Sequence, residues 1–139
     1  MFETEIIIPV RTYDVDFAGV VSNISYARWM EDLRLAMLAK FFPLSKAAAL
    51  GIYPAIAKTT IVYKYPVKLS DEQINGRIRV SKIGKIKATF SAELFSEGRV
   101  HATIEQEGLF LSAQTLRPVK IPEELLALLE LDRQNTLDT

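Results

Sequence analysis

VRTYDVDFAGVVSNISYARW, residues 10–29, is the stretch from which the fold of this chain is most clearly predicted. An acidic pair, Asp14 and Asp16, ends a strand-like run, Gly19 marks a turn, and a helical pattern begins a few residues later. This order places a carboxylate near the exposed N–H groups at the start of a helix. A carboxylate can attack a carbonyl carbon or activate water, while the helix N–H groups stabilise negative charge on the carbonyl oxygen. The stretch therefore favours the hydrolysis of an activated acyl group.

The sequence around this stretch predicts one long helix followed by a sheet. Residues 3–14 are rich in β-branched side chains, which predicts a first strand. Residues 23–42 repeat apolar side chains at three- and four-residue steps, which predicts a helix that Pro43 ends. Strand-like runs follow at residues 55–69, 72–82, 85–95 and 99–112. Because the connections are short, the strands are expected to be antiparallel. The predicted fold is α+β, with one long central helix packed against a single antiparallel sheet.

The length of the chain, 139 residues, suits one domain with a substantial core, which we place at residues 1–131. Pro122 and two following acids predict a short helix near the C-terminus. Residues 132–139 are polar, and we expect them to form a frayed tail. Asn75-Gly76 is interpreted as a bulge within one strand rather than as a hairpin turn.

Composition excludes several classes of function. Seventeen basic and 17 acidic residues give a formal net charge of zero, so no nucleic acid or anionic membrane is favoured as a partner. The chain has no cysteine, which excludes thiol catalysis and thiolate metal sites. Its one histidine, His101, argues against a zinc site and a Ser-His-Asp triad. No apolar run reaches the roughly 20 residues of a membrane helix. We expect a cytoplasmic protein with no metal and no separate cofactor.

With the motif and the order of elements established, the chain resembles the hotdog-fold acyl-CoA thioesterases of the 4-hydroxybenzoyl-CoA thioesterase family. The resemblance covers nearly the whole chain. It rests first on residues 10–26, where an Asp, a short turn with Gly, two aliphatic residues, an Asn and a Tyr follow the family's pattern. YKYPV at residues 63–67, before Asp71, and LRPVKIP at residues 116–122 support it.

The resemblance implies hydrolysis of an acyl-CoA thioester to a free acid and coenzyme A, which enters only as part of the substrate. By position, the family's catalytic carboxylate falls on Asp16 and the backbone N–H that polarises the thioester carbonyl falls on Asn23. Gly19 is the turn residue that lets the backbone approach the substrate. Asp16 acts either as a nucleophile or as a general base. The family also implies a homodimer or homotetramer, because its protomers pair edge to edge and each site contains residues from both.

Further residues are candidates for binding the substrate. Those that flank the carboxylate, or lie one turn into the helix, are expected to line the acyl pocket: Tyr13, Val20, Val21 and Tyr26. Basic side chains in the second half of the chain are candidates for binding the phosphates of coenzyme A: Lys85, Lys87 and Arg117. The competing interpretation is that Tyr26 belongs to the core and that the basic residues belong to an exposed strand face.

Three other titratable residues were weighed as alternatives. Asp14 would project to the same side as Asp16 in a strand and is a second candidate carboxylate, although a solvated or ion-paired role fits it better. Glu31 is on the long helix, where another branch of hotdog thioesterases carries its acid, but pairing with neighbouring helix charges fits it better. His101 alternates with polar residues, which predicts a solvated strand face.

Other functions stay open at this point. A hotdog hydratase usually combines an acid with a histidine, and the one histidine here is far from the motif in sequence. An acyl-ACP thioesterase, with an acyl carrier protein as partner, remains an alternative, as does a non-catalytic module that binds acyl thioesters. The residues favour neither aromatic nor aliphatic acyl groups.

Overall fold

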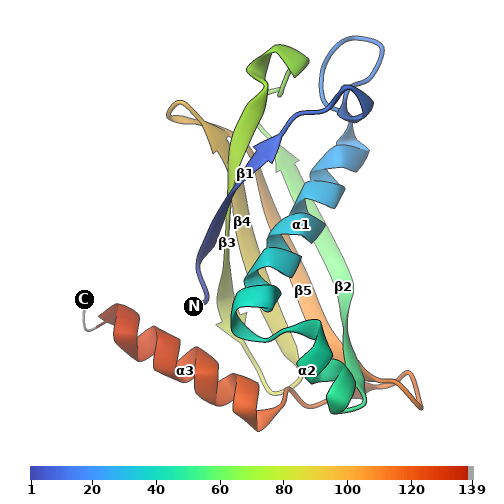
Figure 1. Ribbon diagram of the computed structural model, residues 1–139, viewed down its shortest axis with the longest axis vertical. Helices are drawn as coiled ribbons and strands as arrows, with labels where there is room; N and C mark the ends of the chain where they lie inside the picture. Colours follow the sequence, from blue (N-terminus) through green and yellow to red (C-terminus); the bar gives the residue numbers. More distant parts are fainter. Residues whose placement is uncertain (138–139) are drawn as a thin grey trace.

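The computed structural model describes residues 1–137, in which an antiparallel sheet curves around one long helix (Figure 1). The strands are β1 (Thr4–Pro9), β2 (Ile52–Tyr63), β3 (Gln73–Ile83), β4 (Lys87–Ser96), β5 (Arg99–Ser112) and β6 (Pro118–Val119). The helices are α1 (Asn23–Phe41), α2 (Leu44–Ala49) and α3 (Glu123–Leu137). Two 3-10 turns, η1 (Thr12–Asp14) and η2 (Leu69–Asp71), precede α1 and β3.

The sheet has the strand order β1-β3-β4-β5-β2, every neighbouring pair is antiparallel, and β6 adds to β5. β1 and β2 therefore form its two edges. The loop before α1, η2 and the β4–β5 turn lie at one end of the sheet, whereas α2, α3 and the β3–β4 turn lie at the other (Figure 1). The predicted class, α+β with a helix packed against a single antiparallel sheet, is confirmed.

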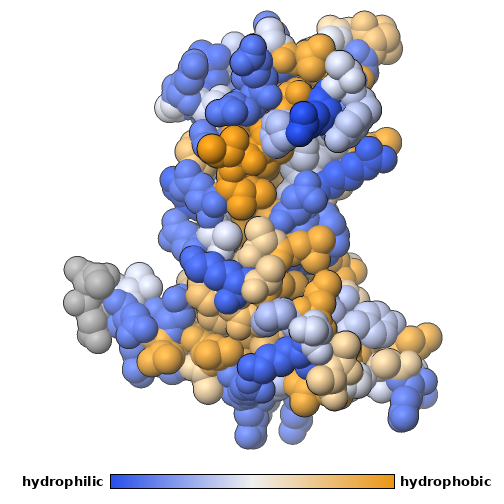
Figure 2. Space-filling view, in the orientation of Figure 1, coloured by the Kyte–Doolittle hydropathy of each residue, from blue (hydrophilic) through white to orange (hydrophobic). Residues whose placement is uncertain are grey.

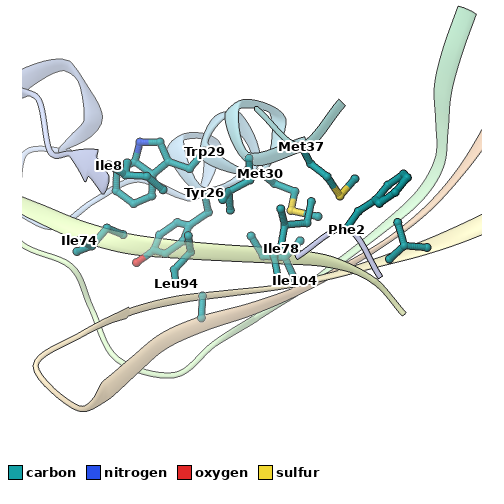
Figure 3. Packing of buried hydrophobic residues seen from close by; sticks show 14 of the residues in the cluster. Phe2, Ile8, Tyr26, Trp29, Met30, Met37, Ile74, Ile78, Leu94 and Ile104 are labelled. Atoms are coloured by element: carbon teal, nitrogen blue, oxygen red, sulfur yellow. The ribbon is translucent and has the colours of Figure 1, made fainter. Parts of the chain in front are cut away.

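The core lies between α1 and the concave face of the sheet. Met30, Leu33 and Met37 of α1 are fully buried, and they face Ile78 and other apolar side chains of β3, β4 and β5 (Figure 3). Gly76 of β3 permits the closest approach, because a Cβ there would lie 2.9 Å from Ile8 Cδ1 and 3.0 Å from Leu33 Cδ1. This glycine is therefore a contact point between helix and sheet.

Three local expectations were wrong. β1 ends at Pro9 rather than at residue 14, because the chain turns into η1. The strand is regular at Asn75-Gly76, and the bulge of β3 lies between Val80 and Lys82 instead. Helix α3 continues through residues 132–137, and the Asp132 carboxylate accepts the Phe2 N–H at 2.7 Å, so this segment is not a frayed tail. Residues 138–139 of the expected tail lie outside the described residues.

The surface mixes hydrophilic and apolar side chains over the face shown in Figure 2, with apolar ones gathered over α2 and along α3. Leu131 of α3, for example, is 55% exposed. Among residues 1–137, no helix is both long enough and apolar enough to cross a membrane.

Candidate functional site

The motif of residues 10–29 forms a small hairpin that runs directly into α1. The Ser22 N–H donates to the Asp14 carbonyl at 2.8 Å, and the Asp16 N–H donates to the Val20 carbonyl at 2.9 Å. The Gly19 N–H closes the turn onto the Asp16 carbonyl at 3.0 Å. Gly19 has a φ of 79°, a conformation that only glycine adopts without strain. The expected glycine turn is therefore present, and it fixes Asp16 relative to the start of the helix.

Asp14 is buried and structural, contrary to the expectation of a solvated or ion-paired acid. Its side chain is 3% exposed and lies in η1 rather than in a strand. The carboxylate accepts the Arg11 N–H at 2.8 Å and the Ser25 hydroxyl at 3.0 Å. It thus fastens the 3-10 turn to the first turn of α1, and the two acids do not project to the same side as a strand would require.

Asp16, in contrast, is exposed to solvent. Its Oδ1 accepts the Ala18 N–H at 2.9 Å, which orients the carboxylate across the turn. In the described part of the chain, Oδ2 contacts no donor. The motif therefore presents one carboxylate that is oriented by the backbone and open to a ligand.

Helix α1 begins at Asn23, with Ser22 as its N-cap. The Ser22 side chain makes no capping bond to the helix N–H groups. Neither the Asn23 N–H nor the Ile24 N–H donates to an acceptor among residues 1–137. These donors stand at the positive end of the helix dipole, so they can bind an oxygen that carries negative charge.

An open groove of about 360 Å³ lies beside this helix start. Two segments line it, residues 20–26 through Val20, Val21, Asn23 and Tyr26, and residues 63–66 through Tyr63, Lys64, Tyr65 and Pro66. The Val21 N–H donates to the Val67 carbonyl at 2.8 Å, which joins the segments. Three residues expected in the acyl pocket, Val20, Val21 and Tyr26, are thus brought together with Asn23.

Tyr26 is the most deeply buried residue of the groove lining. It is 3% exposed and contacts the Trp29 ring at a centroid distance of 5.5 Å (Figure 3). Its ring also contacts the Tyr63 ring edge-on, with ring centroids 5.0 Å apart. Burial raises the pKa of the Tyr26 hydroxyl; a hydrogen bond with the Val67 backbone opposes this shift and the nearby Tyr63 adds to it. Tyr26 therefore remains neutral at physiological pH.

The other predicted binding residues lie elsewhere. Tyr13 is 73% exposed and lines a separate groove together with Arg11 and Arg28. Lys85 and Lys87 flank the β3–β4 turn, at the end of the sheet opposite to Asp16, where the loop that carries Arg117 also lies (Figure 1). Within the chain these basic side chains are therefore far from the motif.

Glu31 forms an ion pair with Arg34 of the same helix, as expected, but Arg34 is buried. The Glu31 Oε2 accepts from Arg34 at 2.6 Å, and the Arg34 side chain is only 10% exposed. Arg34 also donates to Gln106 Oε1 at 2.8 Å. Across the described residues, no group of three or more His, Asp and Glu side chains is placed to hold a metal ion.

His101 is buried at 3% exposure, so the predicted solvated position was wrong. It sits at a bulge where Leu94 pairs with Ala102 and Phe95 with Val100, so His101 itself has no partner on β4. Alternation along a strand does not reveal such a shift. The strand predicted over residues 55–69 was also wrong at its end, because β2 stops at Tyr63 and residues 63–66 form the groove wall; Pro66 was a signal that the chain leaves the sheet there.

A family model described as the thioesterase-like superfamily matches residues 10–129 of the chain. A relative from Aquifex aeolicus (strain VF5), named "Putative esterase", is 26% identical over 122 residues, which cover 87% of this chain and 93% of that protein. A solved structure of a DHNA-CoA thioesterase from Staphylococcus aureus is 21% identical, with a TM-score of 0.85, over 99% of this chain and 95% of that one. A gentisyl-coenzyme A thioesterase is 22% identical, with a TM-score of 0.79, over 88% and 98%.

Proposed function

The chain belongs to the thioesterase-like superfamily, and we propose that it hydrolyses acyl-CoA thioesters to a free acid and coenzyme A. Membership of this superfamily supports thioester hydrolysis as the general reaction. One observation carries the proposal: a single hairpin carries the open Asp16 carboxylate and leads directly into a helix start whose first N–H groups have no acceptor in the described chain. A carboxylate and an oxyanion site are the two groups that this reaction requires.

In the proposed mechanism the acyl group lies in the groove and the thioester oxygen accepts the Asn23 N–H. Asp16 either attacks the carbonyl carbon, giving a mixed anhydride that water then opens, or removes a proton from the attacking water. In both routes the C–S bond breaks, the carbonyl carbon gains the oxygen of water, and the thiolate takes a proton. Loss of one oxyanion donor typically lowers kcat on the order of 100-fold or more.

The groove favours short or planar acyl groups. Tyr26 is the most deeply buried residue of its lining, and the packed side chains of Trp29 and Met30 lie beyond. A long straight chain cannot pass deeper between α1 and the sheet without displacing this core. Val20, Val21 and the exposed Tyr63 ring offer apolar contact area to the acyl group.

Coenzyme A is the proposed thiol carrier because both similar structures described above are named as thioesterases of coenzyme A thioesters. We further propose a homodimer, or a tetramer built from it, that pairs through the free edge of β2. An antiparallel two-fold pairing of β2 would place the far end of the partner's sheet near Asp16. Lys85, Lys87 and Arg117 would then bind the phosphates of a substrate whose thioester lies on the other protomer.

The test is a hydrolysis assay of the purified protein with benzoyl, short-chain and long-chain CoA thioesters, detecting free thiol. We expect Asp16→Asn to lower kcat by several hundredfold or more. Asp71→Asn is the matched control, because Asp71 is also exposed and accepts a backbone N–H, from Lys68 at 2.8 Å. Equal turnover of Asp16→Asn and wild type would refute the role of Asp16.

Two alternatives predict other results in the same assay. Turnover of acyl carrier protein thioesters, with none on any CoA thioester, would identify an acyl-ACP thioesterase. Binding of acyl-CoA that neither is followed by hydrolysis nor depends on Asp16 would identify a non-catalytic binding module.

A further inference from the structure

We infer that His101, oriented by Ser96, is a positioning residue that holds the Tyr63–Pro66 wall of the groove and thereby sets the affinity for the acyl thioester. This inference rests on the proposed function, because the groove is taken as the acyl site. It is independent of Asp16 and of the oxyanion donors, because no hydrogen bond among the described residues joins His101 to either of them.

The wall has little regular structure to hold it. β2 ends at Tyr63, and the next residues, Lys64 to Pro66, belong to no strand. Pro66 has no N–H to donate, and the chain beyond it is held to the motif by the bond from the Val21 N–H to the Val67 carbonyl. The position of the wall therefore depends on a few individual hydrogen bonds.

Three of these hydrogen bonds involve His101. Its carbonyl accepts the Lys64 N–H at 2.8 Å and the Tyr65 N–H at 3.1 Å. Its ring Nδ1 lies 3.1 Å from the Tyr65 carbonyl, the last carbonyl before Pro66. The bulge of β5 turns the imidazole toward this carbonyl. The Tyr65 ring lies against the imidazole, with the two ring centroids 6.1 Å apart.

The partners of the imidazole determine which ring nitrogen donates. The Tyr65 carbonyl can only accept, so Nδ1 carries a hydrogen and donates it to that carbonyl. Nε2 then accepts the hydroxyl proton of Ser96, whose Oγ lies 2.6 Å away. Both ring nitrogens are satisfied, and Ser96 selects the ring orientation that points Nδ1 at the wall.

The outer side of the wall is also covered. The Arg99 guanidinium lies over the Tyr65 ring, with its Cζ 3.9 Å from the ring centroid. Tyr65 is therefore held between Arg99 and His101, while Tyr63 is held by Tyr26 on the groove side. Releasing the Tyr65 carbonyl would let the peptide before Pro66 rotate and would change the shape of the groove without touching the reacting groups.

Two substitutions separate the two ring contacts. In His101→Asn the amide nitrogen replaces Nδ1 and can still donate to the Tyr65 carbonyl, but the contact with Ser96 is lost. In His101→Gln the longer amide replaces Nε2, so Ser96 keeps a partner and the Tyr65 carbonyl loses its donor. The inference predicts a KM close to wild type for His101→Asn and a KM about tenfold higher for His101→Gln, with kcat changed less than about threefold in both.

Ser96→Ala is expected to raise KM by a smaller factor than His101→Gln, because the ring keeps its bond to Tyr65 but loses its orienting partner. The thermal midpoints of all three variants are measured beside the kinetics, because a role in folding alone would lower both midpoints and kcat. Equal KM values in His101→Asn and His101→Gln would overturn the inference, and so would a fall in kcat with KM unchanged.

Amide hydrogen exchange makes the result independent of catalysis. Faster exchange at Lys64 and Tyr65 in His101→Gln than in His101→Asn would support the positioning role even if the wild type hydrolysed no thioester. In that case the proposed hydrolysis would fail while the structural role of His101 stood. Identical exchange in the two variants would overturn the inference whatever the activity of the wild type.

Discussion

Asp14→Asn should separate stability from activity within the motif. The Asp14 carboxylate is 3% exposed and accepts two hydrogen bonds, from the Arg11 N–H at 2.8 Å and from the Ser25 hydroxyl at 3.0 Å. Asparagine keeps one acceptor, but its NH₂ group would face a donor. A lost hydrogen bond to a buried charged group costs about 1.5–3 kcal/mol, so we expect the free energy of unfolding to fall by about 2 kcal/mol.

Urea unfolding at one fixed protein concentration measures this loss. With a typical slope of about 2 kcal/mol per molar urea, the midpoint should fall by about 1 M. Asp71→Asn is the control, because Asp71 accepts the Lys68 N–H in the equivalent 3-10 turn but is exposed, and its midpoint should change little. The folded Asp14→Asn variant should keep kcat within about tenfold of wild type. An unchanged midpoint with a kcat several hundredfold lower would refute the assignment and make Asp14 the reactive carboxylate.

Two further predictions concern buried residues. Because the pKa of Tyr26 is raised in the folded state, its neutral hydroxyl contributes fully to the free energy of unfolding below the unfolded pKa of about 10, and this contribution is lost as the pH rises further. Tyr26→Phe should therefore reduce the fall in the free energy of unfolding between pH 9 and 11, whereas Tyr13→Phe, at an exposed position, should not. Gly76→Ala should lower the free energy of unfolding by about 1–3 kcal/mol, because the alanine Cβ would lie 2.9 Å from Ile8 Cδ1. Adding Ile8→Val, which deletes Cδ1, should restore part of this loss. Strictly additive effects of the two substitutions would contradict the contact.

The long helix, the antiparallel sheet and the glycine turn could be predicted from the sequence because each has a local pattern. Apolar residues repeat at helical steps from Asn23 to Phe41, and Gly19 stands at a position that needs a positive φ. The order of elements then allowed few compact arrangements.

Two features that sequence reasoning missed depend on contacts between residues that are apart in the sequence. Asp14 is withdrawn from the surface because Ser25, 11 residues later, bonds its carboxylate. His101 is buried because a bulge in β5 shifts it and the Tyr65 ring covers it. Neither effect leaves a periodic trace in the sequence, since strand alternation assumes a regular ladder and an exposed face.

The predicted catalytic residues and the predicted coenzyme A-binding residues lie far apart in the chain. Asp16 and the helix start lie at one end of the protomer, whereas Lys85, Lys87 and Arg117 lie at the other end. To bind coenzyme A at the site of Asp16, these basic side chains must belong to a second copy of the chain, which the proposed β2 pairing would bring close. Each site would then take its catalytic groups from one protomer and its nucleotide-binding residues from the other.

Mixed dimers test this division. One protomer carries Asp16→Asn, and the other carries Lys85→Glu and Lys87→Glu. If the division is correct, their mixed dimer contains one site with both defects and one site with neither. Random mixing makes about half of the dimers mixed, so about a quarter of all sites should be intact and restore about a quarter of the wild-type rate. If the lysines acted within their own protomer, every site in the mixed dimer would carry one defect and mixing would restore nothing. That second result would show that Asp16 and the two lysines act in the site of the same protomer, and it would refute the division between protomers.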